Sequence, residues 1–96
     1  MYAGKGLRIE HPVGIVIGSK VIVGENCTIS QGVTIGEKYN DHRSLGGYPV
    51  LGNNISIGVN TIILGKITIG NNVSTGANSL ILANVPPNLT VVGIYK

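Results

Sequence analysis

Apolar residues return at every sixth position along most of this chain, and a glycine usually follows each one. In the second half the row consists of Leu51, Ile57, Ile63 and Ile69, followed by Thr75 and Ile81. Four positions after each member lies a second small or branched residue, namely Ile55, Thr61, Ile67, Val73 and Ser79. The same phase runs earlier through Ile17, Val23, Ile29 and Ile35, with Ile15, Val21, Cys27 and Val33 as the second row.

A period of six excludes an α-helix, whose faces recur at about 3.6 residues. Branched residues favour extended backbone, and Gly-Asn or Asn-Asn pairs supply corners at which a positive φ is easily adopted. One six-residue unit cannot bury its apolar side chains alone, whereas stacked units can. The pattern therefore predicts short parallel strands over residues 17–36 and 51–82, stacked as a hexapeptide β-solenoid.

The phase breaks once, within residues 37–49. Leu51-Gly52 comes sixteen residues after Ile35 instead of six, so about ten residues are inserted there, and this polar loop is expected to project from one corner. Val85-Pro86-Pro87 ends the repeat, and residues 90–94 form a short apolar capping stretch. Residues 1–10 look Gly-rich and irregular, but the alternation of Leu7 and Ile9 suggests a first strand fragment. Counting back in sixes from Ile17 places His11 in a slot that elsewhere holds an aliphatic residue.

Composition narrows the class of protein. At 96 residues the chain is expected to be a single domain, 1–96, and its few aromatic residues suit a narrow solenoid that exposes much surface and oligomerises. The net charge of +3 is mild and the basic residues are scattered, which argues against nucleic-acid binding.

Neither an apolar signal segment nor a membrane span is evident, so we expect a cytoplasmic protein that binds no membrane. Cys27 is predicted to be a buried thiol, with a nucleophile as the alternative.

With these features in view, the chain resembles the hexapeptide-repeat acyltransferases, above all the serine acetyltransferase branch and the related sugar O-acetyltransferases. The resemblance covers residues 7–94 and rests on IEHPVGIVIGSKVIVGENCTISQGVTIG, on the loop, and on the run that ends in VPPNLTVVG. It implies an all-β fold, the left-handed parallel β-helix. It also implies a homotrimer, with acetyl-CoA as co-substrate in the groove between subunits.

The resemblance makes His11 the general base of acetyl transfer to a hydroxyl group. An alcohol is a weak nucleophile, and a positioned imidazole can take its proton as it attacks the thioester. The acidic neighbour is Glu10. The family's orienting Asp would precede Met1, which leaves Glu10 and Asp41 as candidate partners for His11. The family's second His position reads Gly47-Tyr48-Pro49 here, and His42 is a further catalytic candidate.

The remaining candidates bind the two substrates. Asp41, Arg43 and Tyr48 are the expected acceptor-binding residues in the loop. Gly58, Val59, Gly76 and Ala77 match the family's backbone contacts to acetyl-CoA, and Lys96 is the candidate for its phosphates. These glycines are open to the simpler interpretation that they only make corners.

Two other functions compete with acetyl transfer. A hexapeptide carbonic anhydrase needs three zinc-binding His, and this chain has two, so no metal is expected. A non-catalytic trimeric scaffold, a shortened relative that has lost turnover, remains the alternative. The acceptor, serine or a sugar, stays open at this point.

Overall fold

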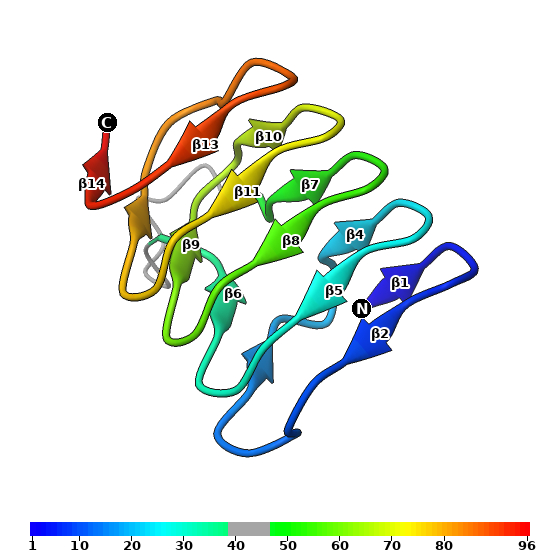
Figure 1. Ribbon diagram of the computed structural model, residues 1–96. Coiled ribbons are helices and arrows are strands. Elements are labelled where there is room, and N and C mark those ends of the chain that lie inside the picture. Colours follow the sequence, from blue (N-terminus) through cyan, green and yellow to red (C-terminus); the bar gives the residue numbers. More distant parts are fainter. Residues whose placement is uncertain (39–46) are drawn as a thin grey trace.

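In the part of the chain that the structure describes, fourteen short parallel strands wind around one apolar core. The computed structural model of the protein describes residues 1–38 and 47–96. The strands are β1 (Tyr2–Ala3), β2 (Arg8–Ile9), β3 (Val16–Ile17), β4 (Ile22–Val23), β5 (Thr28–Ile29), β6 (Thr34–Gly36), β7 (Val50–Leu51), β8 (Ser56–Ile57), β9 (Ile62–Leu64), β10 (Thr68–Ile69), β11 (Ser74–Thr75), β12 (Leu80–Ile81), β13 (Thr90–Val91) and β14 (Ile94–Tyr95). They stack as a parallel β-helix whose first and last strands lie at opposite ends (Figure 1).

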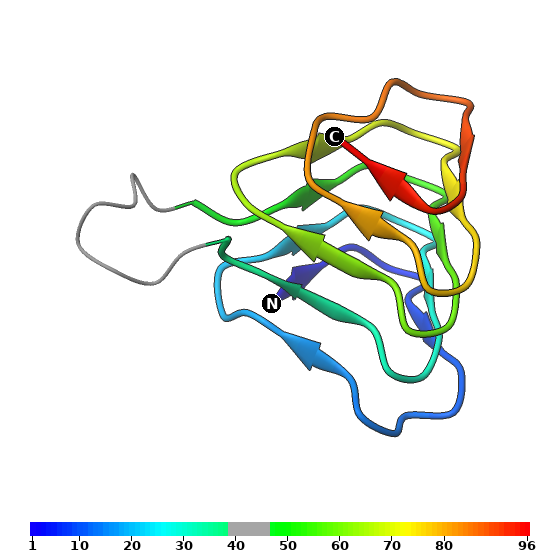
Figure 2. The same ribbon diagram turned by 90° about the vertical axis from the view of Figure 1, so that its left-hand side faces the viewer.

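The coils form three sheets. Sheet A is β1-β4-β7-β10, sheet B is β13-β11-β8-β5-β2, and sheet C is β14-β12-β9-β6-β3. In the regular part the paired residues are 18 positions apart, as in Val50 with Thr68 and Ser56 with Ser74, which is three hexapeptides per coil. Each coil turns at three corners, named here A–B, B–C and C–A after the sheets they join (Figure 2).

The inward residues are the predicted ones. The core contains Val23, Ile29, Ile35, Leu51, Ile57, Ile63, Ile69 and Ile81, each at most 2% exposed. Ile17 also packs against this core but is only partly buried, because its coil is the first of the stack. Identical slots stack in register, so each aliphatic residue contacts its counterpart one coil away, which is what the six-residue phase predicted.

The beginning of the chain confirms one prediction and corrects two. The strand fragment suggested by Leu7 and Ile9 is present as β2, but the rest of residues 1–10 is not irregular, because it adds β1 and completes the start of the first coil. The residue in register with Ile29 is Ile9, not His11, while Ile17 pairs with Ile35. The turn over residues 10–15 is therefore two residues longer than its neighbour over 30–33, and His11 lies in this expansion at the surface.

The end of the chain also continues the β-helix. Residues 90–94 contribute β13 and β14, which extend sheets B and C, and Val91 is buried. The insertion joins β6 to β7 at the C–A corner, and its residues 39–46 lie outside the described part.

Candidate functional site

His11 lies at the B–C corner, in the turn between β2 and β3. The turn is anchored at both ends to the second coil, because the Glu10 N–H donates to the Ile29 carbonyl at 2.8 Å and the Gly32 N–H donates to the Val13 carbonyl at 2.9 Å. Inside the turn the Val13 N–H donates to the His11 carbonyl at 2.6 Å. The backbone of His11 is thus fixed while its side chain is exposed.

The backbone of His11 is in the left-handed region, with φ at 53°. In the described chain the other non-glycine residues with positive φ are all asparagines: Asn26, Asn54, Asn60, Asn72, Asn78 and Asn88. A non-glycine residue in this region stores roughly 1–3 kcal/mol of strain, and such residues cluster at functional sites, although Asn, Asp and His enter it more readily than other residues. His11 is thus the described non-glycine residue other than asparagine that the fold holds in this region, which makes it a candidate functional residue.

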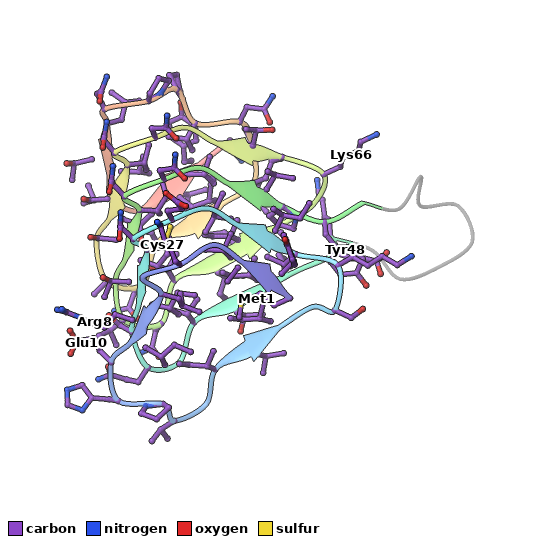
Figure 3. The ribbon with its side chains drawn as sticks, turned by 90° about the vertical axis from the view of Figure 1, so that its right-hand side faces the viewer. Met1, Arg8, Glu10, Cys27, Tyr48 and Lys66 are labelled. Atoms are coloured by element: carbon purple, nitrogen blue, oxygen red, sulfur yellow. The ribbon has the colours of Figure 1, made fainter. Side chains whose placement is uncertain are left out.

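Glu10 faces Arg8 in this structure. Its Oε1 lies 3.9 Å from Arg8 Nη1, and both side chains are well exposed, so the pair contributes little to stability. Figure 3 shows Arg8 and Glu10 on one side of the β-helix and Tyr48 on the opposite side. No carboxylate among residues 1–38 and 47–96 is in an ion pair or hydrogen bond with His11.

The predicted acetyl-CoA residues lie on the same corner as His11. Gly58-Val59 occupies the turn after β8, and Gly76-Ala77 occupies the turn after β11. Backbone bonds tie the successive turns together, since the Asn60 N–H donates to the Gln31 carbonyl at 3.0 Å and the Asn78 N–H to the Val59 carbonyl at 2.8 Å. At about 4.8 Å per coil, Val59 is about 10 Å and Ala77 about 14 Å from the level of His11 along this corner.

The B–C corner leaves backbone donors open. In the described part of the chain, the N–H groups of Gln31, Val59 and Ala77 have no hydrogen-bond partner. The A–B corner differs, because Asn side chains cover two of its amides: Asn53 Oδ1 accepts from the Glu25 N–H, and Asn71 Oδ1 accepts from the Asn53 N–H, both at 2.8 Å. A ligand with carbonyl groups therefore finds donors on the B–C corner.

The glycines at these turns have a packing role as well. A Cβ on Gly58 would lie 2.5 Å from the Thr75 carbonyl oxygen, and one on Gly76 would lie 2.8 Å from Val92 Cγ1. Neither glycine has positive φ, whereas Asn60 and Asn78 of the same turns do. The coils approach so closely here that glycine is required whether or not a ligand binds.

Tyr48 lies at the C–A corner. Its ring covers Gly18, where an added Cβ would be 2.4 Å from Tyr48 Cε1. The Glu37 carboxylate accepts a hydrogen bond from the Tyr48 hydroxyl and raises the pKa of Tyr48, helped by desolvation, while the Ser19 hydroxyl opposes the shift. Sequence inspection missed Glu37 and Ser19, because only the folded corner brings them to Tyr48.

The predicted residues therefore fall into two groups within one chain. His11, Glu10, Gly58, Val59, Gly76 and Ala77 lie at or near the B–C corner, whereas Tyr48 lies at the C–A corner and Lys96 follows β14 on that same edge of sheet C. One side of the β-helix, a hexapeptide that spans at most about 20 Å, separates the two groups. Asp41, His42 and Arg43 lie outside the described residues.

The other candidates are resolved more simply. Cys27 is buried, its Sγ lies 3.3 Å from the Gly52 carbonyl oxygen, and burial raises the pKa of its thiol, so the prediction of a buried thiol is confirmed. No three metal-binding side chains cluster within residues 1–38 and 47–96. The described residues also form no helix long and apolar enough to cross a membrane.

Comparison with known proteins supports the resemblance. No family model matches the chain. A serine acetyltransferase from Synechococcus elongatus is 46% identical over 91 residues, 95% of this chain and 36% of that protein. A putative colanic acid biosynthesis acetyltransferase, WcaB from Escherichia coli, is 44% identical over 90 residues, 94% of this chain and 54% of that protein.

Solved structures agree. A serine acetyltransferase from Brucella abortus in complex with coenzyme A has a TM-score of 0.89 and 35% identity, covering 96% of this chain and 36% of that one. One from Neisseria gonorrhoeae in complex with serine has a TM-score of 0.85 and 40% identity, over 96% and 36%. The left-handed parallel β-helix of hexapeptide repeats is thus confirmed as the fold. The chain spans about a third of the length of these serine acetyltransferases.

Proposed function

We propose that this chain is an acetyl-CoA-dependent O-acetyltransferase that transfers an acetyl group to a hydroxyl acceptor, with His11 as general base. One observation carries the proposal: a strained, exposed histidine shares a corner with a row of open backbone donors. Its relatives add support, because one was solved with coenzyme A and another with serine.

The chemistry at this corner is acyl transfer. The imidazole of His11 takes the acceptor's hydroxyl proton as its oxygen attacks the thioester carbon. The C–O bond forms, the C–S bond breaks, and the proton on His11 passes to the departing CoA sulfur. The thioester end of acetyl-CoA faces His11, and the pantetheine arm follows the corner past the N–H groups of Val59 and Ala77.

The complete site requires a second copy of the chain. In one copy, Tyr48 and Lys96 lie at the C–A corner, across one side of the β-helix from His11 at the B–C corner. In a ring of three copies, the C–A side of one chain meets the B–C corner of the next. Such a homotrimer gives each site the His11 and open amides of one copy and the Tyr48 and Lys96 of its neighbour.

The acceptor is a serine or a sugar hydroxyl. Tyr48, where the serine acetyltransferase pattern has a His, changes the acceptor side and makes a sugar a strong candidate. The similarity to a putative colanic acid biosynthesis acetyltransferase supports the same class. Asp41, His42 and Arg43 of the loop complete the acceptor-binding set, with His42 as a further catalytic candidate.

A non-catalytic scaffold is the second candidate. The pairing of Glu10 with Arg8 favours it, because that pairing leaves His11 without an orienting acid in the described residues. The same trimer would then bind CoA without turnover. A cytoplasmic location stays a prediction.

Transfer assays separate the two functions. Purified protein is incubated with acetyl-CoA and serine or a panel of sugars, and thiol release is followed. Release that depends on one acceptor and is lost in His11→Ala supports the enzyme. CoA binding without acceptor-dependent release supports the scaffold.

Mixing variants tests the shared site. His11→Ala and a Tyr48→Ala variant, each inactive alone, are expected to regain activity when co-refolded, because some interfaces then pair an intact His11 with an intact Tyr48. No recovery, together with a monomeric mass of 10.0 kDa by light scattering, would contradict the intersubunit site.

A further inference from the structure

Three hydroxyl side chains stand inside an otherwise apolar core. Thr61, Thr75 and Ser79 are 0%, 6% and 1% exposed, and they are the buried polar side chains of residues 1–38 and 47–96. Thr75 occupies the slot held by Ile57 one coil below, with which it is in register. Thr61 and Ser79 occupy, on the next two coils, the second-row slot that Val33 holds at the B–C corner. All three therefore gather behind the corner that carries Val59 and Ala77.

Their hydrogen bonds form one continuous chain. The Gly58 N–H is shared between the Thr75 carbonyl oxygen and Thr75 Oγ1, each at 3.1 Å, and Thr75 Oγ1 lies 3.0 Å from Thr61 Oγ1. Thr61 Oγ1 is 3.2 Å from the Gly76 carbonyl oxygen, and Ser79 Oγ donates to that same oxygen at 2.7 Å. No buried side-chain nitrogen or oxygen in the described residues lacks a partner.

The direction of this chain is fixed by its ends. An amide N–H can only donate and a carbonyl oxygen can only accept. Thr75 therefore accepts from Gly58 and donates to Thr61, and Thr61 donates to Gly76. Hydrogen bonds aligned in one direction polarise and strengthen one another. The Gly76 carbonyl is the terminus of this chain and receives two hydroxyl donors.

The consequence falls on the peptide unit between Gly76 and Ala77. The Gly76–Ala77 peptide bond is trans, like the other peptide bonds of residues 1–38 and 47–96, so the Ala77 N–H points opposite to the Gly76 carbonyl. That carbonyl is held inward by Thr61 and Ser79, and the N–H is therefore directed outward, where no described residue accepts from it. Two hydrogen bonds to the carbonyl also make the N–H of the same unit a stronger donor.

We propose that Thr61, Thr75 and Ser79 are positioning residues for the donor substrate: they orient and polarise the Gly76–Ala77 peptide so that its N–H binds a carbonyl oxygen of the pantetheine arm. This inference rests on the proposed function. It gives three core side chains a role in substrate affinity. They do not contact the substrate themselves and act through the backbone that they position.

The A–B corner supplies a matched comparison. Cys27 occupies the second-row slot at the A–B corner, and its thiol lies 3.3 Å from the Gly52 carbonyl oxygen. There the outward N–H of Asn53 already donates to Asn71. A buried group at that slot therefore has no open amide to prepare, and its loss is expected to leave CoA binding unchanged.

Calorimetric titration with CoA tests the proposal in the full chain. Ser79→Ala and Thr61→Val are each expected to weaken CoA binding about three- to tenfold, the effect of one lost hydrogen bond. Thr61→Ser, which keeps the hydroxyl, retains the wild-type Kd, and so does Cys27→Ala. The KM for the acceptor stays within about twofold in all four. Adenosine 3′,5′-bisphosphate, which lacks the pantetheine arm, binds the wild type and Ser79→Ala equally.

Each outcome decides the matter. If Ser79→Ala and Thr61→Val bind CoA as the wild type does, the hydroxyls only satisfy the core, and the inference is wrong while the proposed function stands. If the wild type binds neither CoA nor acetyl-CoA, both fail. Should Ser79→Ala not fold, the Ala77 amide proton of Thr61→Val is followed by NMR. It is expected to move upfield and to shift less on CoA addition, and an unchanged resonance overturns the inference.

Discussion

Replacing His11 with glycine should abolish acetyl transfer without destabilising the protein. The backbone of His11 sits at φ 53°, where an L-residue is about 1–2 kcal/mol less favourable than in the right-handed region. Glycine relieves this strain but adds about 0.5–1 kcal/mol of unfolded-state entropy. The exposed imidazole contributes within about 0.5 kcal/mol through its surroundings. The backbone terms together favour the folded state of His11→Gly by about 0 to 1.5 kcal/mol, and the loss of the imidazole shifts this by at most about 0.5 kcal/mol either way.

His11→Ala is the matched variant, because alanine loses the imidazole and keeps the strain. For a 96-residue domain, 1 kcal/mol corresponds to about 4–8 °C in Tm, so His11→Gly should melt at or above His11→Ala by up to that amount. Both variants should lose about 10²–10⁴-fold in acetyl transfer while CoA affinity changes little. Melting is compared at equal protomer concentration, because an oligomer's Tm depends on it.

A different result would refute this account of His11. If His11→Gly and His11→Ala both melt many degrees lower than the wild type, the imidazole stabilises the first coil. If the wild type also transfers acetyl to no hydroxyl acceptor, His11 is structural and the scaffold is the better explanation. His42→Ala is the control, with a smaller loss expected mainly in the acceptor KM.

Three further predictions concern the other corners. Asn71→Ala leaves the Asn53 N–H uncovered and should lower stability by about 1 kcal/mol, measured as a lower Tm with an unchanged Kd for CoA. Cys27 should resist a thiol reagent at pH 8 until the protein is unfolded, because it is buried and its pKa is raised; rapid labelling of folded protein would contradict its placement. The pKa of Tyr48 is raised in the folded state, so folding favours its protonated form, and its contribution to stability should be constant below the ordinary tyrosine pKa of about 10 and fall as the pH rises above it. Between pH 9 and 11 the Tm of Tyr48→Phe should therefore fall less than the Tm of the wild type.

The sequence was sufficient to predict the core because every coil repeats the same environment. Ile29, Ile57 and the other inward residues are interchangeable positions of one pattern, so a phase found in one coil predicts the rest. That phase failed at the first coil. Residues 10–15 contain two more residues than the equivalent turn, and counting in sixes from Ile17 cannot tell an expanded turn from an irregular start.

The site was less accessible to sequence inspection, because its properties depend on contacts between coils. Nothing in the spacing says that Asn53 and Asn71 cover the amides of the coils beside them, or that Thr61 and Thr75 meet across 14 positions of sequence. Thr75 and Ser79 look like lapses in an apolar row until their hydrogen bonds are seen, Thr75 with Thr61 and Ser79 with the Gly76 carbonyl. The separation of His11 from Tyr48 likewise appears only once the corners are assigned.

The corners differ in how their backbone donors are used. Stacked hexapeptide turns direct backbone N–H groups outward at each coil, so every corner could in principle bind a ligand rich in carbonyl groups. At the A–B corner, asparagine side chains occupy two of those donors, the N–H groups of Glu25 and Asn53. At the B–C corner, Val59 and Ala77 have side chains that cannot accept a hydrogen bond, and hydroxyls from the core hold one open peptide in place. Under the proposed function the ligand therefore binds along the B–C corner, where two successive turns keep their N–H groups free and where His11 also lies.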